Sequence, residues 1–313
     1  MIPFLLARKR RAGATLGVGF GRDGAAVARA SGGGRDRPPR LDQAAWLPAA
    51  DPVALARQLE AVVDDQGLAR TRAVGVVAPG DYHVVQIETP RVPAAEMNQA
   101  AAWYVRDLID MPLDQAVIET FEPPEAAQRG EPQTNVVVAR RSVVDERAQL
   151  IRDAGLDLVA LDIPELAQRN ICHRLPAARG GHALLALDDT GGLLTVYRDG
   201  LLFLARSLHT GHAALLGEDA ATIENLVLEV QRSFDYFESA LAQPPLGALY
   251  IYPATAATER VAAEVGASLS GVDCRCIRLD EIADVASEPD PASERAPLLQ
   301  AVGAALREHE VPA

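Results

Sequence analysis

The stretch Thr15-Leu-Gly-Val-Gly-Phe-Gly-Arg-Asp-Gly-Ala-Ala-Val-Ala-Arg29 decides the fold. Two short apolar runs flank a turn that contains glycine, which predicts a strand, a tight turn and a second strand. The same order returns later in the chain, where Ala183-Leu-Leu-Ala-Leu187 and Leu193-Leu-Thr-Val-Tyr197 flank a turn at 188–192. The chain therefore opens two units in the same way, which predicts two lobes of related topology.

Paired glycine turns suit a phosphate ligand, because backbone N–H groups can approach phosphate oxygens closely where no Cβ intervenes. A duplicated strand, turn and strand is typical of actin-like ATPases, in which the two turns hold the phosphates of a nucleotide across a cleft. We therefore expect an α/β protein with the actin-like (ribonuclease H-like) two-lobed fold. The candidate nucleotide-binding residues are Gly17, Gly19, Gly21 and Arg22 in the first turn and Asp188, Thr190 and Gly191 in the second.

The segment between the two openings carries an additional unit. Residues 80–155 follow the order strand, helix, strand, strand, helix, with one helix expected at 94–109 and another at 142–154. Ser142 is the expected N-cap of the second helix, and Gly155 is its expected stop. The expected organisation is a flexible basic and apolar N-terminus at 1–14, a first lobe at 15–79 and 156–178, an inserted β-α-β-β-α subdomain at 80–155, and a second lobe at 179–313 whose last helix packs back on the first lobe.

Three parts of the chain resemble one protein family closely. They are Ala102–Pro112 with Val117–Pro124, Val137–Ser142 with Leu156–Leu166, and Ser233–Ser239 with Pro244-Pro245 and Leu249-Tyr250. In order and spacing they resemble the MshI family, the biogenesis proteins of mannose-sensitive haemagglutinin (MSHA) pili. MshI is similar to PilM, the actin-like cytoplasmic protein of type IV pilus assembly. The resemblance runs from about residue 15 to 308. It implies that the cytoplasmic tail of an inner-membrane partner docks between the inserted subdomain and the first lobe.

All three corners of the implied nucleotide cleft depart from the pattern of PilM-like proteins. Their first turn reads Gly-x-Asp-x-Gly-Ser, whereas here Gly19 stands at the aspartate position and Arg22 at the serine position. The second turn contains two adjacent carboxylates, Asp188 and Asp189, which repel a phosphate unless a cation intervenes. The adenine-side turn reads Tyr252-Pro-Ala-Thr-Ala256 in place of glycines.

These departures bear on catalysis, because phosphoryl transfer relies on a positioned metal ion, a positioned water and stabilised charge. Without the corresponding carboxylates we expect no enzyme, no required cofactor, and at most weak binding of ATP and Mg²⁺.

The composition excludes other classes of site and partner. The formal net charge is −13, which argues against nucleic acid as a partner. The three cysteines are too few and too scattered for a disulfide framework. Cys274 and Cys276 lack further metal ligands nearby in the sequence, as do His209 and His212, so we expect no metal site.

The N-terminal residues leave two interpretations open. An apolar tip at 1–7 precedes four basic residues at 8–11, which is the wrong charge order for a signal peptide. Residues 1–11 would either contact an anionic membrane surface or form a solvated end. No stretch reaches the roughly 20 apolar residues that a membrane span needs. We expect a cytoplasmic protein, peripheral at the inner membrane.

Trp103 and Asp107 stand four residues apart on the first helix of the inserted subdomain, and therefore on one face. The favoured interpretation is a core tryptophan beside a solvated aspartate, and a peptide-docking surface is the alternative. The expected function is that of a cytoplasmic actin-like scaffold of MSHA-type pilus biogenesis. The alternatives are a nucleotide-binding switch or ATPase of the same fold, and the actin-like cytoplasmic component of a type II secretion system.

Overall fold

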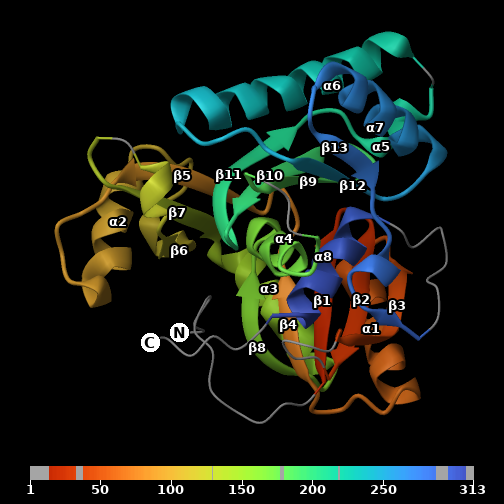
Figure 1. The fold of residues 1–313 in the computed structure, drawn as a ribbon. Helices are drawn as coiled ribbons and strands as arrows, with labels where there is room; N and C mark the ends of the chain where they lie inside the picture. Colours follow the sequence, from red (N-terminus) through yellow and green to blue (C-terminus); the bar gives the residue numbers. More distant parts are fainter. Residues whose placement is uncertain are drawn as a thin grey trace.

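The computed structural model describes residues 14–32, 38–128, 130–176, 180–217, 219–286 and 295–307. Its strands form three sheets, of six, five and three strands. Figure 1 shows two lobes one above the other, helices between them, and the smallest sheet at one side. Residues 1–13 of the expected N-terminal segment, and the expected lobe boundary at residue 178, lie outside the described residues.

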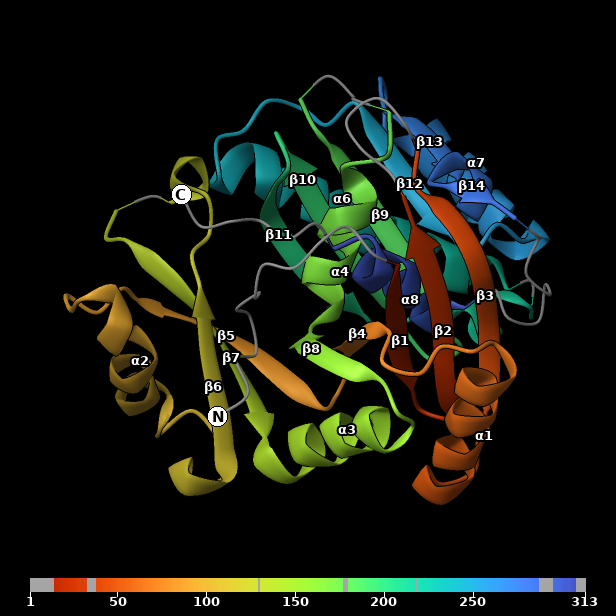
Figure 2. The same cartoon turned by 90° about the horizontal axis from the view of Figure 1, so that it is seen from below.

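The first lobe is built on a sheet with the strand order β14-β3-β2-β1-β4-β8. Its strands are β1 (Thr15–Gly21), β2 (Gly24–Ser31), β3 (Arg40–Pro48), β4 (Arg72–Val76), β8 (Asp157–Asp162) and the two-residue β14 (Asp284–Val285). Helices α1 (Pro52–Asp65) and α3 (Arg141–Asp153) cover its outer face (Figure 2). Leu16, Val18 and Phe20 of β1 are fully buried in the core on this side.

The second lobe is built on a sheet with the strand order β11-β10-β9-β12-β13. Its strands are β9 (His182–Leu187), β10 (Gly192–Arg198), β11 (Leu201–Leu208), β12 (Ala248–Tyr252) and β13 (Asp273–Cys276). A two-residue hairpin turn joins β10 to β11, and Asp199 and Gly200 both have positive φ there. The outer face of the sheet is covered by α5 (His212–Leu215), α6 (Ala220–Asp235), its π-helical continuation (Tyr236–Ala240) and α7 (Ala256–Ser268).

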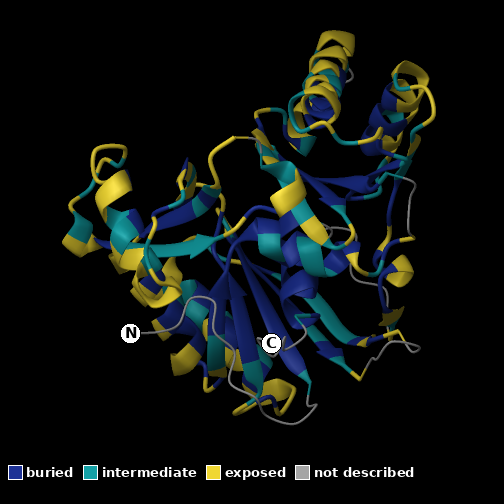
Figure 3. Ribbon diagram, turned by 60° about the vertical axis from the view of Figure 1, so that its left-hand side comes forward, coloured by how far each residue is buried: buried dark blue, intermediate teal, exposed yellow. Residues whose placement is uncertain are grey.

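Two helices form a layer between the sheets of the two lobes: α4 (Pro164–Cys172) and α8 (Ala296–Ala305). One core cluster joins Ala26 and Ala28 of β2, Leu299 of α8, and Leu184 and Ala186 of β9. The lobes therefore share a continuous apolar core through these helices. Figure 3 shows this layer and the strands beside it buried, whereas the outer helices carry exposed faces.

The third sheet has the order β5-β7-β6, with β5 (Tyr82–Glu88), β6 (Ala116–Phe121) and β7 (Gln133–Arg140). Helix α2 (Met97–Val105) packs on one face through Ala101 and Val105, which meet Ile87 and Val136 in a small core of their own. The opposite face joins the core of the first lobe through residues such as Val137. This unit lies within the range 80–155 expected for the inserted subdomain. Among the described residues no helix combines the length and apolar composition needed to cross a bilayer.

Three local expectations were wrong. Ser142 is not an N-cap, because β7 runs directly into α3 and the helix already begins at Arg141, whose guanidinium donates to the carbonyl oxygens of Asp114 and Ala116. The helix expected at 94–109 is shorter, with a 3₁₀ turn at Ala94–Glu96 followed by α2. Trp103 is 62% exposed and is not a core residue. The small face of α2 is already filled by Ala101 and Val105, so the tryptophan points outward.

Candidate functional site

The two predicted turns face one another across a cavity of about 680 Å³ between the lobes. Gly21 and Arg22 line it from the first turn, and Asp188, Thr190 and Gly191 line it from the second. Five of the seven candidate residues therefore meet at one place. Gly17 and Gly19 do not line this cavity.

Gly17 and Gly19 face the helix layer between the lobes. A Cβ atom at Gly17 would overlap the backbone of Ala301, and one at Gly19 would overlap the carbonyl group of Pro297. Both neighbours belong to α8, whose backbone lies directly on β1. The absence of a Cβ atom at both glycines therefore lets α8 pack directly against the backbone of β1. Helix α8 covers the face of the strand from which a ligand would otherwise reach the two glycines.

The N–H groups of the second turn are already occupied by a side chain of the same turn. Asp188 Oδ1 accepts hydrogen bonds from the backbone nitrogens of Thr190 at 2.8 Å and Gly191 at 2.7 Å. This is the arrangement of an Asx turn. The carboxylate thus stands where an anionic ligand of the turn would bind. The carbonyl groups are satisfied as well, since those of Asp188 and Asp189 accept from the nitrogens of His212 and Ala213 in α5.

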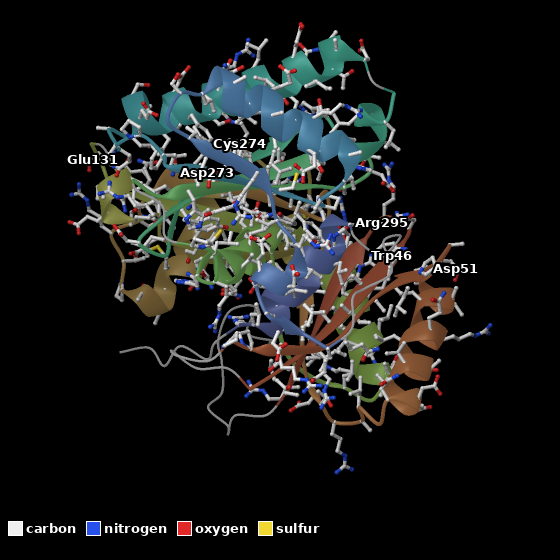
Figure 4. The ribbon with its side chains drawn as sticks, turned by 45° about the vertical axis from the view of Figure 1, so that its right-hand side comes forward. Trp46, Asp51, Glu131, Asp273, Cys274 and Arg295 are labelled. Carbon is white, nitrogen blue, oxygen red and sulfur yellow. The ribbon has the colours of Figure 1, made fainter. Side chains whose placement is uncertain are left out.

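An arginine at the start of α8 connects the two turns across the cavity. Arg295 Nη1 lies 3.3 Å from Asp23 Oδ2 of the first turn and 2.8 Å from Asp189 Oδ2 of the second. Its guanidinium also stacks over the ring of Trp46 at 5.2 Å, and Figure 4 shows the two side chains together at the rim between the lobes. A cation of the chain itself therefore bridges the carboxylates on both sides of the cleft.

The third corner, Tyr252–Thr255, does not line this cavity. Thr255 is the N-cap of α7, and its hydroxyl accepts from the nitrogen of Thr258 while the Thr258 hydroxyl accepts from the nitrogen of Thr255. This capping box occupies N–H groups of the helix terminus that would be available to an anion. His212 of the expected His209–His212 pair bonds Thr255 as well, at 2.9 Å from Nε2 to Oγ1.

Three buried polar atoms of residues that line the cavity have no hydrogen-bond partner within the described part of the chain: Asp81 Oδ2, Arg147 Nε and Gln300 Oε1. Gln300 of α8 is only 2% exposed, and its Oε1 accepts no hydrogen bond there. The arginine on the opposite wall, Arg147, pairs with Asp81 at 3.6 Å and with Glu146 at 3.2 Å. Asp81 Oδ2 has the Arg147 guanidinium as a charged neighbour, whereas Gln300 Oε1 is an acceptor that no charged group compensates in the described part of the chain.

The expected thiol pair lies in the core of the second lobe. Cys274 and Cys276 sit on β13 and belong to the apolar cluster beneath α7. Burial raises the pKa of Cys274 to about 12 and that of Cys276 to about 11, so both thiols stay protonated at neutral pH. Over the residues with described positions, no cluster of three or more His, Cys, Asp or Glu side chains could hold a metal ion.

A second cavity, of about 600 Å³, lies between the three-stranded sheet and the second lobe. We call it the groove. One wall carries four carboxamide side chains, and the other is mainly apolar. The carboxamides are Gln86, Gln128, Gln133 and Asn135, and the apolar side chains are Leu202, Phe203, Leu204, Tyr236 and Leu241. The groove was not predicted from the sequence, because its walls belong to segments about 100 residues apart in the chain.

The floor of the groove is a buried polar pair. Tyr82 donates from its hydroxyl to Glu165 Oε2 at 2.7 Å, which joins β5 to α4. Burial raises the pKa of the Glu165 carboxyl, although the hydrogen bond from Tyr82 opposes that effect. Burial and the neighbouring Glu165 carboxylate raise the pKa of Tyr82. Both groups are held in place by the fold, so the floor has a defined shape.

Two strands beside the groove are the outermost strands of their sheets. β5 ends the three-stranded sheet and β11 ends the five-stranded sheet. The outer edge of such a strand presents backbone N–H and C=O groups that no neighbouring strand pairs. The groove thus combines open backbone edges, amide side chains and an apolar wall. This is the chemistry that binds an extended peptide.

Comparison with known proteins places the fold. No protein-family model matches the chain, and no curated protein sequence matches it. The solved structure of a PilM-PilN type IV pilus biogenesis complex is similar over 96% of this chain and 100% of that one, with a TM-score of 0.70 and 19% identity.

Two further solved structures are similar. One is the cytoplasmic domain of EpsL, an inner-membrane component of the type II secretion system of Vibrio cholerae, with a TM-score of 0.51 and 10% identity over 82% of this chain and 96% of that one. The other is the ethanolamine utilization protein EutJ from Carboxydothermus hydrogenoformans, with a TM-score of 0.50 and 12% identity over 97% and 93%. At these identities the likeness shows the fold, and the chain has the expected α/β, actin-like two-lobed fold.

Proposed function

We propose that this chain is a cytoplasmic actin-like scaffold of type IV pilus biogenesis, of the MSHA type, that binds the cytoplasmic tail of an inner-membrane assembly partner. The proposal joins the MshI-like segments of the sequence to the full-length similarity with the PilM of a PilM-PilN complex. The observation that carries it is the groove, which has the shape and chemistry of a peptide site.

An extended tail fits the groove for a physical reason. Backbone groups of the tail would pair with the edge of β5 or β11, as in strand addition to an exposed sheet edge. Carboxamides can both donate to and accept from a peptide backbone, which suits the wall formed by Gln86, Gln133 and Asn135. Alternate side chains of the tail would enter the apolar wall at Phe203 and Tyr236. The partner would then hold the inserted subdomain against the second lobe. This site differs from the one that the family resemblance implies, which lies between the inserted subdomain and the first lobe.

The proposed mechanism is binding without chemistry. The cleft between the lobes is bridged by Arg295 and its second turn is capped by Asp188, so the backbone N–H groups of Thr190 and Gly191 already have a partner within the chain. The proposal therefore includes no catalytic residue and no required cofactor. The protein would lie in the cytoplasm at the inner membrane, and residues 1–11 would add contact with an anionic lipid surface.

The groove can be tested by placing charge on its two edges. Val84 of β5 is 40% exposed and Leu202 of β11 is partly buried, and both line the groove. We expect the double variant V84E/L202E to lose capture of pilus-assembly proteins from solubilised inner membranes, as read by mass spectrometry. V53E is the matched control, because Val53 is exposed on α1, away from the groove. Equal capture by V84E/L202E and the unmodified chain would contradict the proposed docking site.

The same experiment separates the pilus proposal from a secretion role. The similarity to the EpsL cytoplasmic domain supports that alternative, although it covers less of this chain. Enrichment of type II secretion proteins, with no pilus-assembly protein, would replace the pilus assignment by the secretion assignment.

The second candidate function is a nucleotide-dependent switch of the same fold. It is favoured by the unsatisfied Oε1 of Gln300, which would accept a hydrogen bond from an N–H or O–H of a ligand in the cleft. Titration calorimetry with Mg-ATP distinguishes the two candidates. We expect no saturable heat at ligand concentrations up to the millimolar range. Saturable micromolar binding would establish the switch in place of the scaffold without nucleotide.

A further inference from the structure

Helix α2 and the turn after it carry an exposed aromatic patch, formed by Trp103 and Tyr104 of the helix and Leu108 of the turn. Their side chains are 62%, 53% and 62% exposed. Figure 1 places α2 at the far side of the inserted subdomain, away from both lobes. Tryptophan and tyrosine contribute large contact areas at protein interfaces and are enriched there. Exposed apolar side chains of this size on a helix and the turn after it indicate a contact surface.

The fold does not require this patch. The inner face of α2 already fills the small core of the subdomain with Ala101 and Val105, both fully buried. The Arg106 guanidinium lies 5.8 Å from the centre of the Trp103 ring of the patch. The same guanidinium pairs with Asp107 at 3.0 Å, so its charge is compensated locally.

The surroundings of the patch are acidic. Glu96 precedes α2, and Asp110 and Asp114 follow it, all with exposed side chains. Within the described residues none of these three carboxylates forms an ion pair, whereas the only basic residue between 94 and 115 is Arg106. The Arg141 guanidinium donates to the carbonyl oxygen of Asp114 and offsets part of the charge there. The surface still carries exposed carboxylates before and after its helix, and it complements a segment that is apolar on one side and basic on the other.

We propose that the aromatic patch binds a basic amphipathic segment of an inner-membrane protein, in the stretch that adjoins its membrane span on the cytoplasmic side. Cytoplasmic segments next to membrane spans are rich in lysine and arginine. This proposal rests on the proposed function, which places the chain at that membrane face. The patch and the groove lie on opposite faces of the three-stranded sheet, so one partner tail in the groove leaves the patch free for a second segment.

The charges disfavour the two other occupants. An anionic lipid surface would approach Glu96, Asp110 and Asp114 with charge of the same sign. A second copy of the chain, paired patch to patch, would bring the same three carboxylates opposite one another. A basic segment alone gains from both the apolar and the acidic parts of this surface.

The test uses a synthetic helical peptide with leucine on one face and lysine on the other, labelled for fluorescence anisotropy. A peptide of the same composition with the leucines scattered is the control ligand. Binding is measured with the full chain, with W103S/L108S, and with V53S, which removes a side chain of the same 62% exposure from α1. The replaced side chains lie on the surface, and circular dichroism with thermal melting verifies that each variant folds as the unmodified chain does.

We expect W103S/L108S to weaken peptide binding about tenfold or more, and V53S to leave it unchanged. The triple variant E96Q/D110N/D114N should weaken binding about threefold to tenfold and flatten its dependence on salt. Equal affinity of W103S/L108S, or equal affinity for the scattered peptide, would overturn the proposal, because the attraction would then be to the net charge of the chain alone.

Two further outcomes also decide against it. One is binding to phosphatidylglycerol vesicles that depends on Trp103 and Leu108, which would assign the patch to lipid. The other is a dimer in analytical ultracentrifugation that W103S/L108S abolishes, which would assign it to a second copy. V84E/L202E should bind the peptide normally. A failure of the proposal for the groove can therefore be distinguished from a failure of the proposal for the patch.

Discussion

The two lobes open with the same strand, turn and strand, and they use glycine differently. In both lobes the first strand pairs antiparallel with the second along its length. In β1 the residues facing the helix layer are Gly17 and Gly19, and the backbone of α8 lies directly on them. In β9 the corresponding face carries Leu184 and Ala186, which meet the same layer through side chains. One topology therefore supports two kinds of contact, and a glycine at the expected place does not by itself indicate a ligand.

The largest expected effect comes from adding a methyl group to β1. G17A and G19A should each lower the free energy of unfolding by about 3 kcal/mol or more, because the new Cβ meets backbone atoms of α8 that cannot rotate away. Urea denaturation followed by circular dichroism measures the change.

The control variant for G17A and G19A is expected to change the free energy of unfolding in the opposite direction. Gly266 lies in α7 with only ordinary contact around an added Cβ, so G266A should stabilise by up to about 1 kcal/mol through helix propensity. If G17A proved as stable as the unmodified chain, α8 would not be seated on β1, and the first turn would again be open to a ligand.

What the sequence predicted was local. The paired openings and the order of strands and helices between residues 80 and 155 follow from neighbouring residues, and the structure has them in that order. β3 was not predicted, because only Leu41 and Leu47 of its nine residues are buried and its pattern does not alternate. Its partner β14 has two residues and comes from far along the chain.

The site was predictable to the same extent. The residues of the two turns were identified because glycine and aspartate mark turns in any sequence. The close packing of α8 on Gly17 and Gly19 depends on Pro297 and Ala301, which come some 280 residues later in the chain. The bridge made by Arg295 has the same origin. Contacts of this kind have no periodic signature, so only the folded chain reveals them.

A second difference between the two openings lies at their first residues, and it predicts a dependence of stability on pH. β1 begins with Thr15, which does not ionise in this range, whereas β9 begins with His182, 9% exposed and between the rings of Tyr197 and Tyr250. Burial, aided by the charge of His173, lowers the pKa of His182 to about 4. The folded state thus favours the neutral imidazole. Its stabilising contribution is complete above the unfolded pKa near 6.5 and is lost as the pH falls towards 4.

We expect the loss from this single group to reach about 2 to 3 kcal/mol between pH 6.5 and pH 4. Other groups also titrate there, so the quantity to measure is the difference between the unmodified chain and H182Q. Urea denaturation at a series of pH values should give a shallower decline for H182Q. Parallel curves for the two proteins would show that His182 does not carry the acid sensitivity of the second lobe.

The smallest expected effect concerns Arg295, which pairs with a carboxylate of each opening. Its partners Asp23 and Asp189 are 62% and 51% exposed, and solvent screens such pairs strongly. R295Q should therefore lower the free energy of unfolding by less than about 1 kcal/mol. The informative readout is the separation of the lobes. Because the bridge spans the cleft, raising the salt concentration should increase the radius of gyration of the unmodified chain in X-ray scattering, and R295Q should already be expanded at low salt.

The control variant R91Q removes a more exposed pair, Arg91 with Glu131, that lies within the inserted subdomain and spans no cleft. It should leave both the radius and its salt dependence unchanged. If R295Q were as compact as the unmodified chain at every salt concentration, the shared core through α4 and α8 would hold the lobes without help from charge.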